Sequence, residues 1–283
     1  MLTRTHKLIE QINQYTVKFK HTLWFSNHPK VFCNSFHKSG TQLLVQALTG
    51  IQGIHHYNRS AFHHILTKNQ INPAHNSTFE EVNDQLAGLL PGEMMGGHVE
   101  YHAAIEQAIQ AYNVGHVLII RDPRDVIISH LFWWEEHQEI DIWPFRFFKS
   151  LKTRDEKLMF LILGHDYESI KSDKNYPYLN FPNIIERFET YKNWLSSPHC
   201  LVVHFEDMKA NPHDEFKRIF SWIWPQKFFS EAIYKKMAAA SHQKFSKTYR
   251  ISKTGQWQAY FNEEHVEAFY QLGGQRLLRN FLM

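Results

Sequence analysis

Short apolar runs alternate along this chain with segments of helical periodicity. Three runs, at residues 31–33, 115–120 and 200–205, are apolar enough to be buried strands, and a glycine-containing run at 93–99 predicts a fourth. Between the runs, apolar residues recur on one face of successive amphipathic helices. Because strands and helices alternate, the pattern predicts an α/β fold whose mainly parallel central sheet has helices on both faces.

We expect a single domain over residues 1–283, since no Gly/Ser-rich or Pro-rich linker and no internal repeat divides the chain. The core is expected from about residue 28, after an amphipathic helix over 3–25. Residues 133–180 mix aromatic clusters with polar stretches, which indicates helices plus a lid-like loop. Further helices are predicted at 41–48, 101–112 and 182–194, between Thr78 and Pro91, and from Pro212 and Glu263 onward.

Composition narrows the classes of partner. The net charge of +3, without a dense run of Lys or Arg, does not favour nucleic acid. No run approaches the length of a membrane span, and the polar N-terminus lacks the apolar region of a signal peptide. Cys33 and Cys200 lie in apolar runs, so we expect buried thiols and no disulfide.

Histidines gather at residues 55–64, as two adjacent pairs. A zinc site is one interpretation, but no cysteine or carboxylate completes it, and adjacent histidines do not chelate one ion well. Surface or pocket-lining histidines are therefore favoured, and no metal is expected.

The segment from His37 to Thr41, sequence HKSGT, joins the first strand to a helix and carries the strongest chemical signal. Unpaired N–H groups at a helix start and the helix dipole both favour an anion there. Lys38 adds a positive charge, while Ser39 and Thr41 can cap the helix or donate to phosphate oxygens. The loop is not a Walker A motif, because Lys38 precedes Gly40. The plainer alternative is a capped helix with one solvated lysine.

Arg121 follows the strand at 115–120, and Asp122 with Pro123 marks a strong helix start directly after it. Open α/β sheets bind ligands at the carboxyl ends of their strands. An arginine at that edge can hold a phosphate with two hydrogen bonds. An ion pair with Asp125 is the alternative.

Four segments together resemble the sulfotransferase family that uses 3′-phosphoadenosine 5′-phosphosulfate (PAPS), closest to its cytosolic-type branch. Residues 35–43, SFHKSGTQL, are similar to the family's 5′-phosphosulfate loop, Y-P-K-S-G-T-T-W. Residues 121–129, RDPRDVIIS, are similar to its 3′-phosphate motif, R-N-P-K-D-x-x-x-S. Residues 205–209, FEDMK, resemble Y-E-D-M-K, and residues 250–257 resemble R-K-G-x-x-G-D-W.

The resemblance implies PAPS as the donor substrate, no metal, a cytoplasmic location and a small-molecule acceptor with a hydroxyl or an amine. It also implies roles for individual residues. His98 falls at the position of the catalytic base, and Lys38 would contact the bridging oxygen of the donor. The implied donor-binding residues are Lys38, Ser39, Gly40, Thr41, Gln42, Arg121, Ser129, Phe205, Tyr234 and Arg250.

Several positions depart from the family pattern. Leu43 replaces a tryptophan near the adenine, and Phe205 lacks a tyrosine hydroxyl. Ile251 and Ser252 replace a Lys-Gly pair, and Gly96 stands where many members have a lysine. The family's C-terminal dimer motif is not present, so the oligomeric state stays open.

The residues suit this chemistry. A neutral histidine can take the acceptor's proton, typically worth about 10² to 10⁴ in rate. Lys38 and the N–H groups of the loop stand where charge develops on the leaving phosphate. Two alternatives remain: a P-loop kinase or NTPase, for which Glu206 and Asp207 are the acidic candidates, and a nucleotide-binding protein with a degenerate site. The acceptor is not identified, but residues 132–148 and 55–64 are expected to line its side of the site.

Overall fold

The computed structural model describes residues 25–51, 53–63, 77–137, 143–165, 181–241 and 253–282. The sequence predictions that fall outside these residues include Arg250, the expected 3′-phosphate ligand, and the helix at 3–25 apart from its last residue. No helix in the described ranges is both long and apolar enough to cross a membrane.

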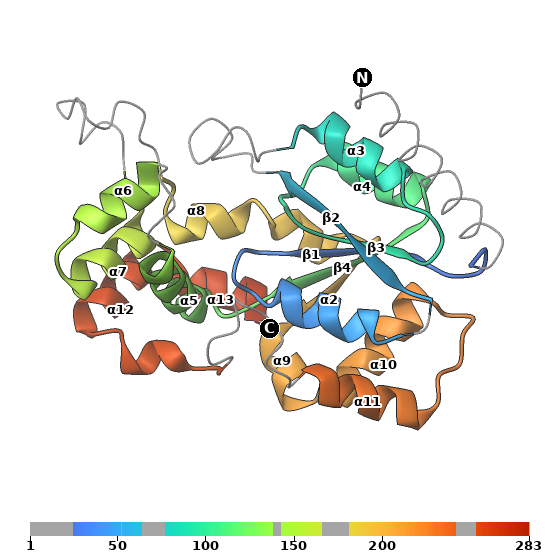
Figure 1. Ribbon diagram of the computed structural model, residues 1–283. Helices are drawn as coiled ribbons and strands as arrows, with labels where there is room; N and C mark the ends of the chain where they lie inside the picture. Colours follow the sequence, from blue (N-terminus) through green and yellow to red (C-terminus); the bar gives the residue numbers. More distant parts are fainter. Residues whose placement is uncertain are drawn as a thin grey trace, which may run out of the picture.

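A five-stranded, all-parallel sheet forms the centre of the molecule (Figure 1), which confirms the predicted fold class. The strand order is β2-β3-β1-β4-β5. The central strand β1 therefore pairs with β3 on one side and with β4 on the other. The strands are β1 (Lys30–Ser35), β2 (His55–His63), β3 (Glu93–Val99), β4 (Val114–Ile120) and β5 (Cys200–His204).

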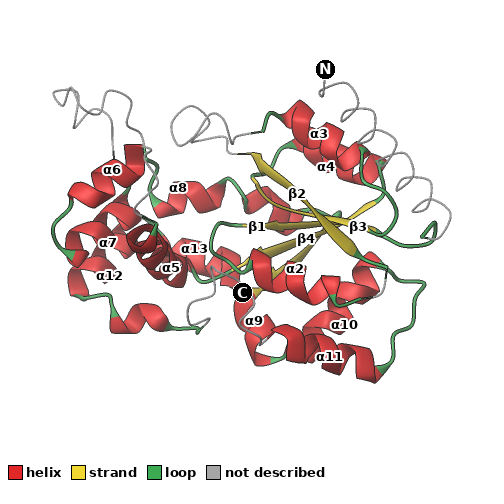
Figure 2. Cartoon of the chain, in the orientation of Figure 1, coloured by secondary structure: helices red, strands yellow, loops and turns green. Residues whose placement is uncertain are grey.

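Alternate side chains of the strands enter two separate cores, because successive residues of a strand face opposite sides of the sheet. Val31 and Cys33 belong to one core, and Phe32 to the other. Figure 2 shows the helices on the two faces. The Val31 side is covered by α2 (Thr41–Thr49), α9 (Phe205–Ala210), α10 (Pro212–Ile223) and α11 (Glu231–Ser241), and the Phe32 side by α3 (Phe79–Ala87) and α4 (Ala103–Ala111).

A second group of helices lies beyond the carboxyl ends of the strands, on the left of Figure 1. Its aromatic side chains extend the Phe32 core. The described parts of 133–180 belong to this group as helices, and the predicted lid-like loop lies in the undescribed part. The group consists of α5 (Pro123–Glu136), α6 (Trp143–Ser150), α7 (Arg154–Leu163), α8 (Ile184–Glu189), η4 (Gln256–Ala259), α12 (Glu263–Gln271) and α13 (Gly274–Leu282), while η3 (Lys192–Ser196) leads from α8 back to β5.

The structure corrects the sequence analysis at two elements. The helix predicted at 182–194 is divided into α8 and the 3-10 helix η3, because Thr190 turns toward β3 and its carbonyl accepts the N–H of Tyr101 at 2.9 Å. Strand β2 was not predicted at all. It is an edge strand with a register shift between His56 and Ser60, and such irregular strands lack a clean alternation of apolar and polar residues.

The two cysteines are buried and free, as expected. Cys33 lies in β1 and Cys200 at the start of β5, and burial raises the thiol pKa of each above its ordinary value. Both thiols therefore stay protonated near neutral pH and act as apolar core groups.

Candidate active site

The loop between β1 and α2 is held in a conformation that few residues adopt. Lys38 has a φ of 66° and Gly40 a φ of 110°, both in the left-handed region. A Cβ on Gly40 would also lie 2.7 Å from the ring of Phe205, so a glycine is required there on both counts. Backbone strain of this kind is characteristic of ligand-binding loops.

Helix α2 begins at this loop without a side-chain cap. This corrects the expectation that Ser39 or Thr41 caps the helix. The Thr41 hydroxyl instead makes a short hydrogen bond with the Ser35 hydroxyl, and Ser39 Oγ is buried with no hydrogen-bond partner among the described residues. The start of α2 therefore keeps its N–H groups and the Ser39 hydroxyl available to an anion.

His98 is joined directly to the strand that precedes the loop. Its Nδ1 lies 2.9 Å from Ser35 Oγ and 3.0 Å from the Ser35 carbonyl oxygen. Because a carbonyl oxygen only accepts, the second contact places the hydrogen on Nδ1. The basic lone pair then belongs to Nε2, as a proton acceptor requires.

Further cationic and aromatic groups surround His98. The imidazole of His37 stacks on that of His98 with ring centres 3.9 Å apart, and His130 lies 6.4 Å from His37. The Lys38 Nζ is 5.1 Å from the ring centre of Trp133 on α5. Burial lowers the pKa of Lys38 to about 8, with the charge of Arg121 contributing and that of Glu136 opposing.

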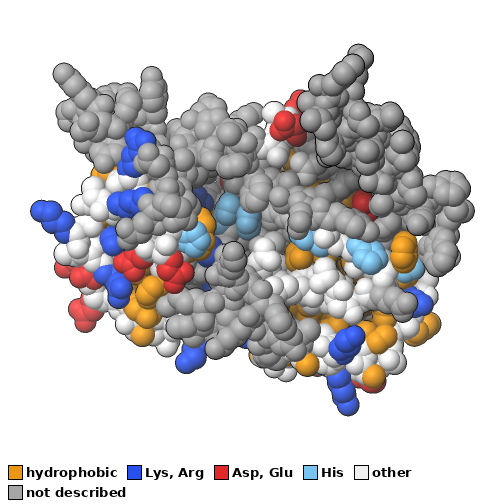
Figure 3. Space-filling view, viewed as in Figure 1, with side chains coloured by type: hydrophobic (Ala, Val, Ile, Leu, Met, Phe, Trp, Pro, Cys, Tyr) orange, Lys and Arg blue, Asp and Glu red, His pale blue; other side chains and the backbone are white. Residues whose placement is uncertain are grey.

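Figure 3 shows histidine side chains in a band across the middle of the face seen there. The loop after β1 lies in this region of Figure 1. Burial holds the pKa of His130 well below its ordinary value, so this ring is neutral near pH 7.

Arg121 lies where β4 ends, about 4% exposed. Its guanidinium packs 4.4 Å from the Phe205 ring centre and donates to the carbonyl of Lys253 at 2.7 Å. The ion pair with Asp125, weighed as the alternative role, is present at 3.5 Å. It leaves Arg121 Nε buried and without a hydrogen-bond partner in the described chain.

Asp125 connects the segment at 121–129 to the C-terminal segment that contains Gly255 and Trp257. Its carboxylate accepts the backbone N–H of Gly255 at 2.7 Å and that of Trp257 at 3.0 Å. Two segments 130 residues apart in sequence thereby meet at Arg121. Sequence reasoning missed this role. The available signal was an aspartate in the first turn of a helix, a few residues after an arginine.

The remaining predicted donor residues occupy different surroundings. Ser129 lies on α5, half-buried, and Gln42 is exposed on the first turn of α2. Tyr234 lies on α11 and packs against the rings of Phe220 and Phe229. Helix α11 contacts α2, but the Tyr234 ring is buried in that packing, so its contact with adenine stays a prediction.

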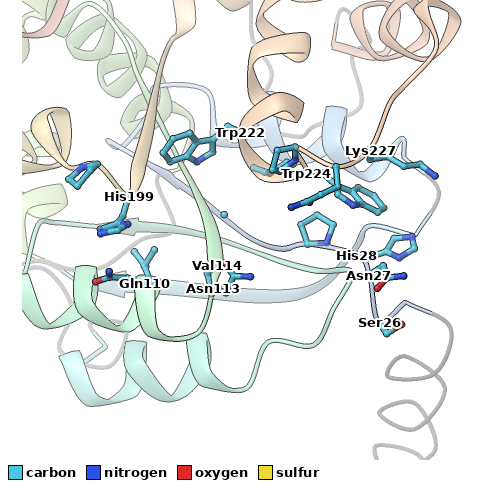
Figure 4. Close-up of a pocket in the computed structure, with 17 residues that line it drawn as sticks. Ser26, Asn27, His28, Gln110, Asn113, Val114, His199, Trp222, Trp224 and Lys227 are labelled. Carbon is cyan, nitrogen blue, oxygen red and sulfur yellow. The ribbon is translucent and has the colours of Figure 1, made fainter.

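A large pocket lies elsewhere, at the amino ends of β1 and β4 (Figure 4). Its volume is about 1000 Å³, and Trp222, Trp224 and His28 contribute to its lining. None of the predicted site residues lines it. Within the described ranges, no group of three or more His, Cys, Asp or Glu side chains is arranged to hold a metal ion.

A strand, a strained loop and an uncapped helix lie beside a histidine and an arginine, an arrangement suited to binding an anion. In agreement, the sulfotransferase domain family matches this chain over residues 28–280. The chain therefore belongs to the sulfotransferases. A comparison with the sequences of curated proteins finds no match.

Solved sulfotransferase structures share the fold. Mouse sulfotransferase SULT7A1, crystallised with PAP, gives a TM-score of 0.60 at 14% identity over 89% of this chain and 84% of its own. Retinol dehydratase gives 0.54 at 14% identity in its complex with androsterone and PAP, covering 89% of this chain and 82% of that one. Its complex with retinol and PAP gives 0.54 at 15%, covering 89% and 83%. At sequence identities this low, the structural similarity shows the fold alone.

Proposed function

We propose that this protein transfers a sulfonate group from PAPS to a hydroxyl or an amine of a small-molecule acceptor. The observation that carries the proposal is the contact between Ser35 and His98. It joins the histidine to the strand that opens the anion-binding loop, so a proton acceptor and a phosphosulfate site share one rigid support.

The residues present fit the donor. Ser39 Oγ and Arg121 Nε are buried polar atoms without hydrogen-bond partners among the described residues, one at each of the two loops. Lys38 and the start of α2 would hold the 5′-phosphosulfate, and Arg121 with Ser129 the 3′-phosphate. Arg250 and Tyr234 are proposed as further ligands of the phosphate and the adenine.

When bound, the donor supplies an activated sulfonate on a phosphate oxygen. His98 Nε2 takes the proton of the acceptor hydroxyl or amine as the new bond to sulfur forms. Lys38 and the N–H groups of α2 stabilise the charge left on the phosphate oxygen. Ser35 holds His98 in the tautomer that this role needs. Trp133, stacked near Lys38, is proposed to line the acceptor side.

Ligand-dependent thermal unfolding tests the donor class. We expect 3′,5′-adenosine bisphosphate (PAP), the donor product, to raise the midpoint temperature, and ATP with Mg²⁺ to leave it unchanged. At about 100 times the dissociation constant, a ligand adds about 2.7 kcal/mol of stability, which shifts the midpoint by several degrees. A shift with ATP–Mg²⁺ alone favours a kinase or NTPase, and no shift with either favours a degenerate site.

A transfer assay with PAPS and a panel of hydroxyl and amine acceptors tests the reaction itself. Sulfonated product that disappears when the same panel is run with His98→Ala supports the full proposal. PAP binding without transfer to any acceptor by the wild-type protein contradicts the enzymatic part of it.

A further inference from the structure

Arg187, on α8, is a cation that the proposed donor chemistry does not use. Its guanidinium lies 5.4 Å from the ring centre of Phe36 and 5.0 Å from that of Phe181. It forms no ion pair with any described residue. Desolvation lowers the pKa of Arg187 to about 10, and the nearby Tyr191 and Glu100 oppose that shift. An arginine this deep is normally paired with a carboxylate.

The residue is not sealed in the core. Its accessible surface is intermediate, whereas the neighbouring Phe36 and Phe188 are buried. The Arg187 side chain is therefore surrounded by protein on most sides but remains partly accessible to solvent. Between two aromatic rings, the planar guanidinium directs its N–H groups away from the ring faces, where they can take a two-oxygen anion.

A second polar group lies beside it without a partner. Tyr191, on the turn after α8, has a buried hydroxyl with no hydrogen-bond partner among the described residues. Its ring packs at 5.4 Å against that of Phe36. Burial holds the pKa of Tyr191 well above its ordinary value, so the hydroxyl remains a donor near neutral pH.

Arg187 is linked to the proposed base, His98, through neighbouring side chains. Phe36, which contacts Arg187, immediately precedes His37, and His37 stacks on His98. The charges of Arg187, Lys38 and His98 all disfavour protonation of His130, which places these side chains in one electrostatic neighbourhood. An anion on Arg187 would thus lie close to an acceptor group on His98.

We infer that Arg187 and Tyr191 form an anion subsite for the acceptor, so that the preferred acceptor carries a carboxylate or a similar two-oxygen anion besides its hydroxyl or amine. The inference rests on the proposed function and narrows its acceptor class. It also assigns Arg187 a role in acceptor specificity, separate from the donor site of Lys38 and Arg121.

A matched pair of acceptors tests the subsite: 3-(4-hydroxyphenyl)propanoate and its methyl ester, which differ in the negative charge and share the phenol. Binding to the PAP-loaded protein is measured by calorimetry, and sulfonate transfer as kcat/KM. In wild type we expect the affinity and the kcat/KM for the acid to be at least tenfold higher than those for the ester. In Arg187→Met the values for the two compounds should agree within about twofold. Tyr191→Phe should reduce the preference less.

Controls separate the subsite from folding and from the donor. Arg218→Met removes an exposed arginine of α10 and should preserve the preference, and each variant's unfolding midpoint reports its stability. Arg187→Lys keeps a charge if Arg187→Met does not fold, and should retain part of the preference. The PAP-induced thermal shift should be the same in wild type and Arg187→Met.

Three results overturn the subsite: equal use of acid and ester by wild type, a preference that survives in Arg187→Met, or no binding of either compound. A weaker PAP shift in Arg187→Met would assign the residue to the donor instead. If PAP binds no form of the protein, the proposed function fails separately, and the acid–ester comparison on ligand-free protein still tests the anion subsite.

Discussion

The two edges of the parallel sheet differ in what they offer a ligand. At the carboxyl edge, α2 and α5 begin, and their N-termini direct partial positive charge into the site. At the amino edge, α4 and α10 end beside the pocket of about 1000 Å³, where Gln110, Ile223 and Trp224 form part of its wall. Helix C-termini carry partial negative charge, so this pocket is the poorer place for an anion.

The side chains at the two edges of the sheet also differ. The carboxyl edge holds Lys38, Arg121 and His98 around a strained loop. At the amino edge, Trp222 is fixed through its indole N–H to the carbonyl of His116 at 3.0 Å. His116 itself is buried under Phe32 and Trp194, and burial lowers its pKa to about 3, which makes it a neutral core residue. The proposed location of the site therefore rests on the chemistry of these side chains.

The largest effect is expected for His98→Ala. Removal of the base should lower turnover about 10² to 10⁴-fold, while PAP binding stays within about twofold of wild type. His199→Ala, at the amino-edge pocket, is the matched control and should keep full turnover. Steady-state kinetics with PAPS and thermal shifts with PAP measure the two quantities. Normal turnover of His98→Ala would remove the base assignment.

Lys38→Ala should weaken both turnover and donor binding. A charge-assisted hydrogen bond contributes about 1.5 to 3 kcal/mol, so PAP affinity should fall roughly tenfold or more. Lys227→Ala removes a lysine from the amino-edge pocket and should leave PAP affinity unchanged. Calorimetric titration with PAP compares the variants. An equal loss of PAP affinity in Lys38→Ala and Lys227→Ala would contradict the assignment of the donor to the carboxyl edge.

The pKa of Lys38 predicts a pH dependence. Because it is about 8 in the folded protein, Lys38 loses its charge as pH rises through 8, and PAP affinity should fall there in wild type but not in Lys38→Met. Between pH 8 and 10.5 the unfolded chain binds more protons at this residue, so ligand-free stability should rise with pH relative to Lys38→Met. PAP titrations at several pH values measure the affinity, and unfolding midpoints measure the stability. A difference between wild type and Lys38→Met that does not change with pH would contradict the lowered pKa.

Asp125→Asn should destabilise the fold by about 2 kcal/mol. One amide oxygen cannot replace two carboxylate oxygens that hold Gly255 and Trp257, and Arg121 would lose its buried counter-charge. Urea unfolding measures the loss. Asp214→Asn, at an exposed carboxylate, should stay within about 0.5 kcal/mol of wild type, and a similar value for Asp125→Asn would refute the fastening role.

The smallest effect is expected for Gly96→Lys, which restores the lysine that many family members have. A Cβ at Gly96 would meet Val45, His56 and Thr41 at 3.6 to 4.0 Å, which is ordinary contact for that atom. The added charge should tighten PAP binding a few-fold. Gly96→Met, of similar length without charge, is the control, and equal affinities for both variants would exclude an electrostatic gain.

Local sequence predicted the parts of this site that depend on neighbours along the chain. The apolar runs predicted four of the five strands, because β1, β3 and β4 are mostly buried and the edge strand β5 is apolar and pairs with β4 without a register shift. The HKSGT loop predicted an anion site because glycine, hydroxyl residues and a helix start suffice for one. The edge strand β2 escaped prediction because its polar residues and register shift disguise the alternation.

Only the tertiary structure decided which distant residues meet. Ser35 and His98 are 63 positions apart, and Asp125 and Gly255 are 130 apart, yet each pair is joined by a hydrogen bond. No local pattern encodes such contacts, since the pairing of parallel strands and the packing of α5 create them. The same holds for Arg187, whose sequence surroundings resemble any amphipathic helix, and which only folding places beside the loop that precedes Lys38.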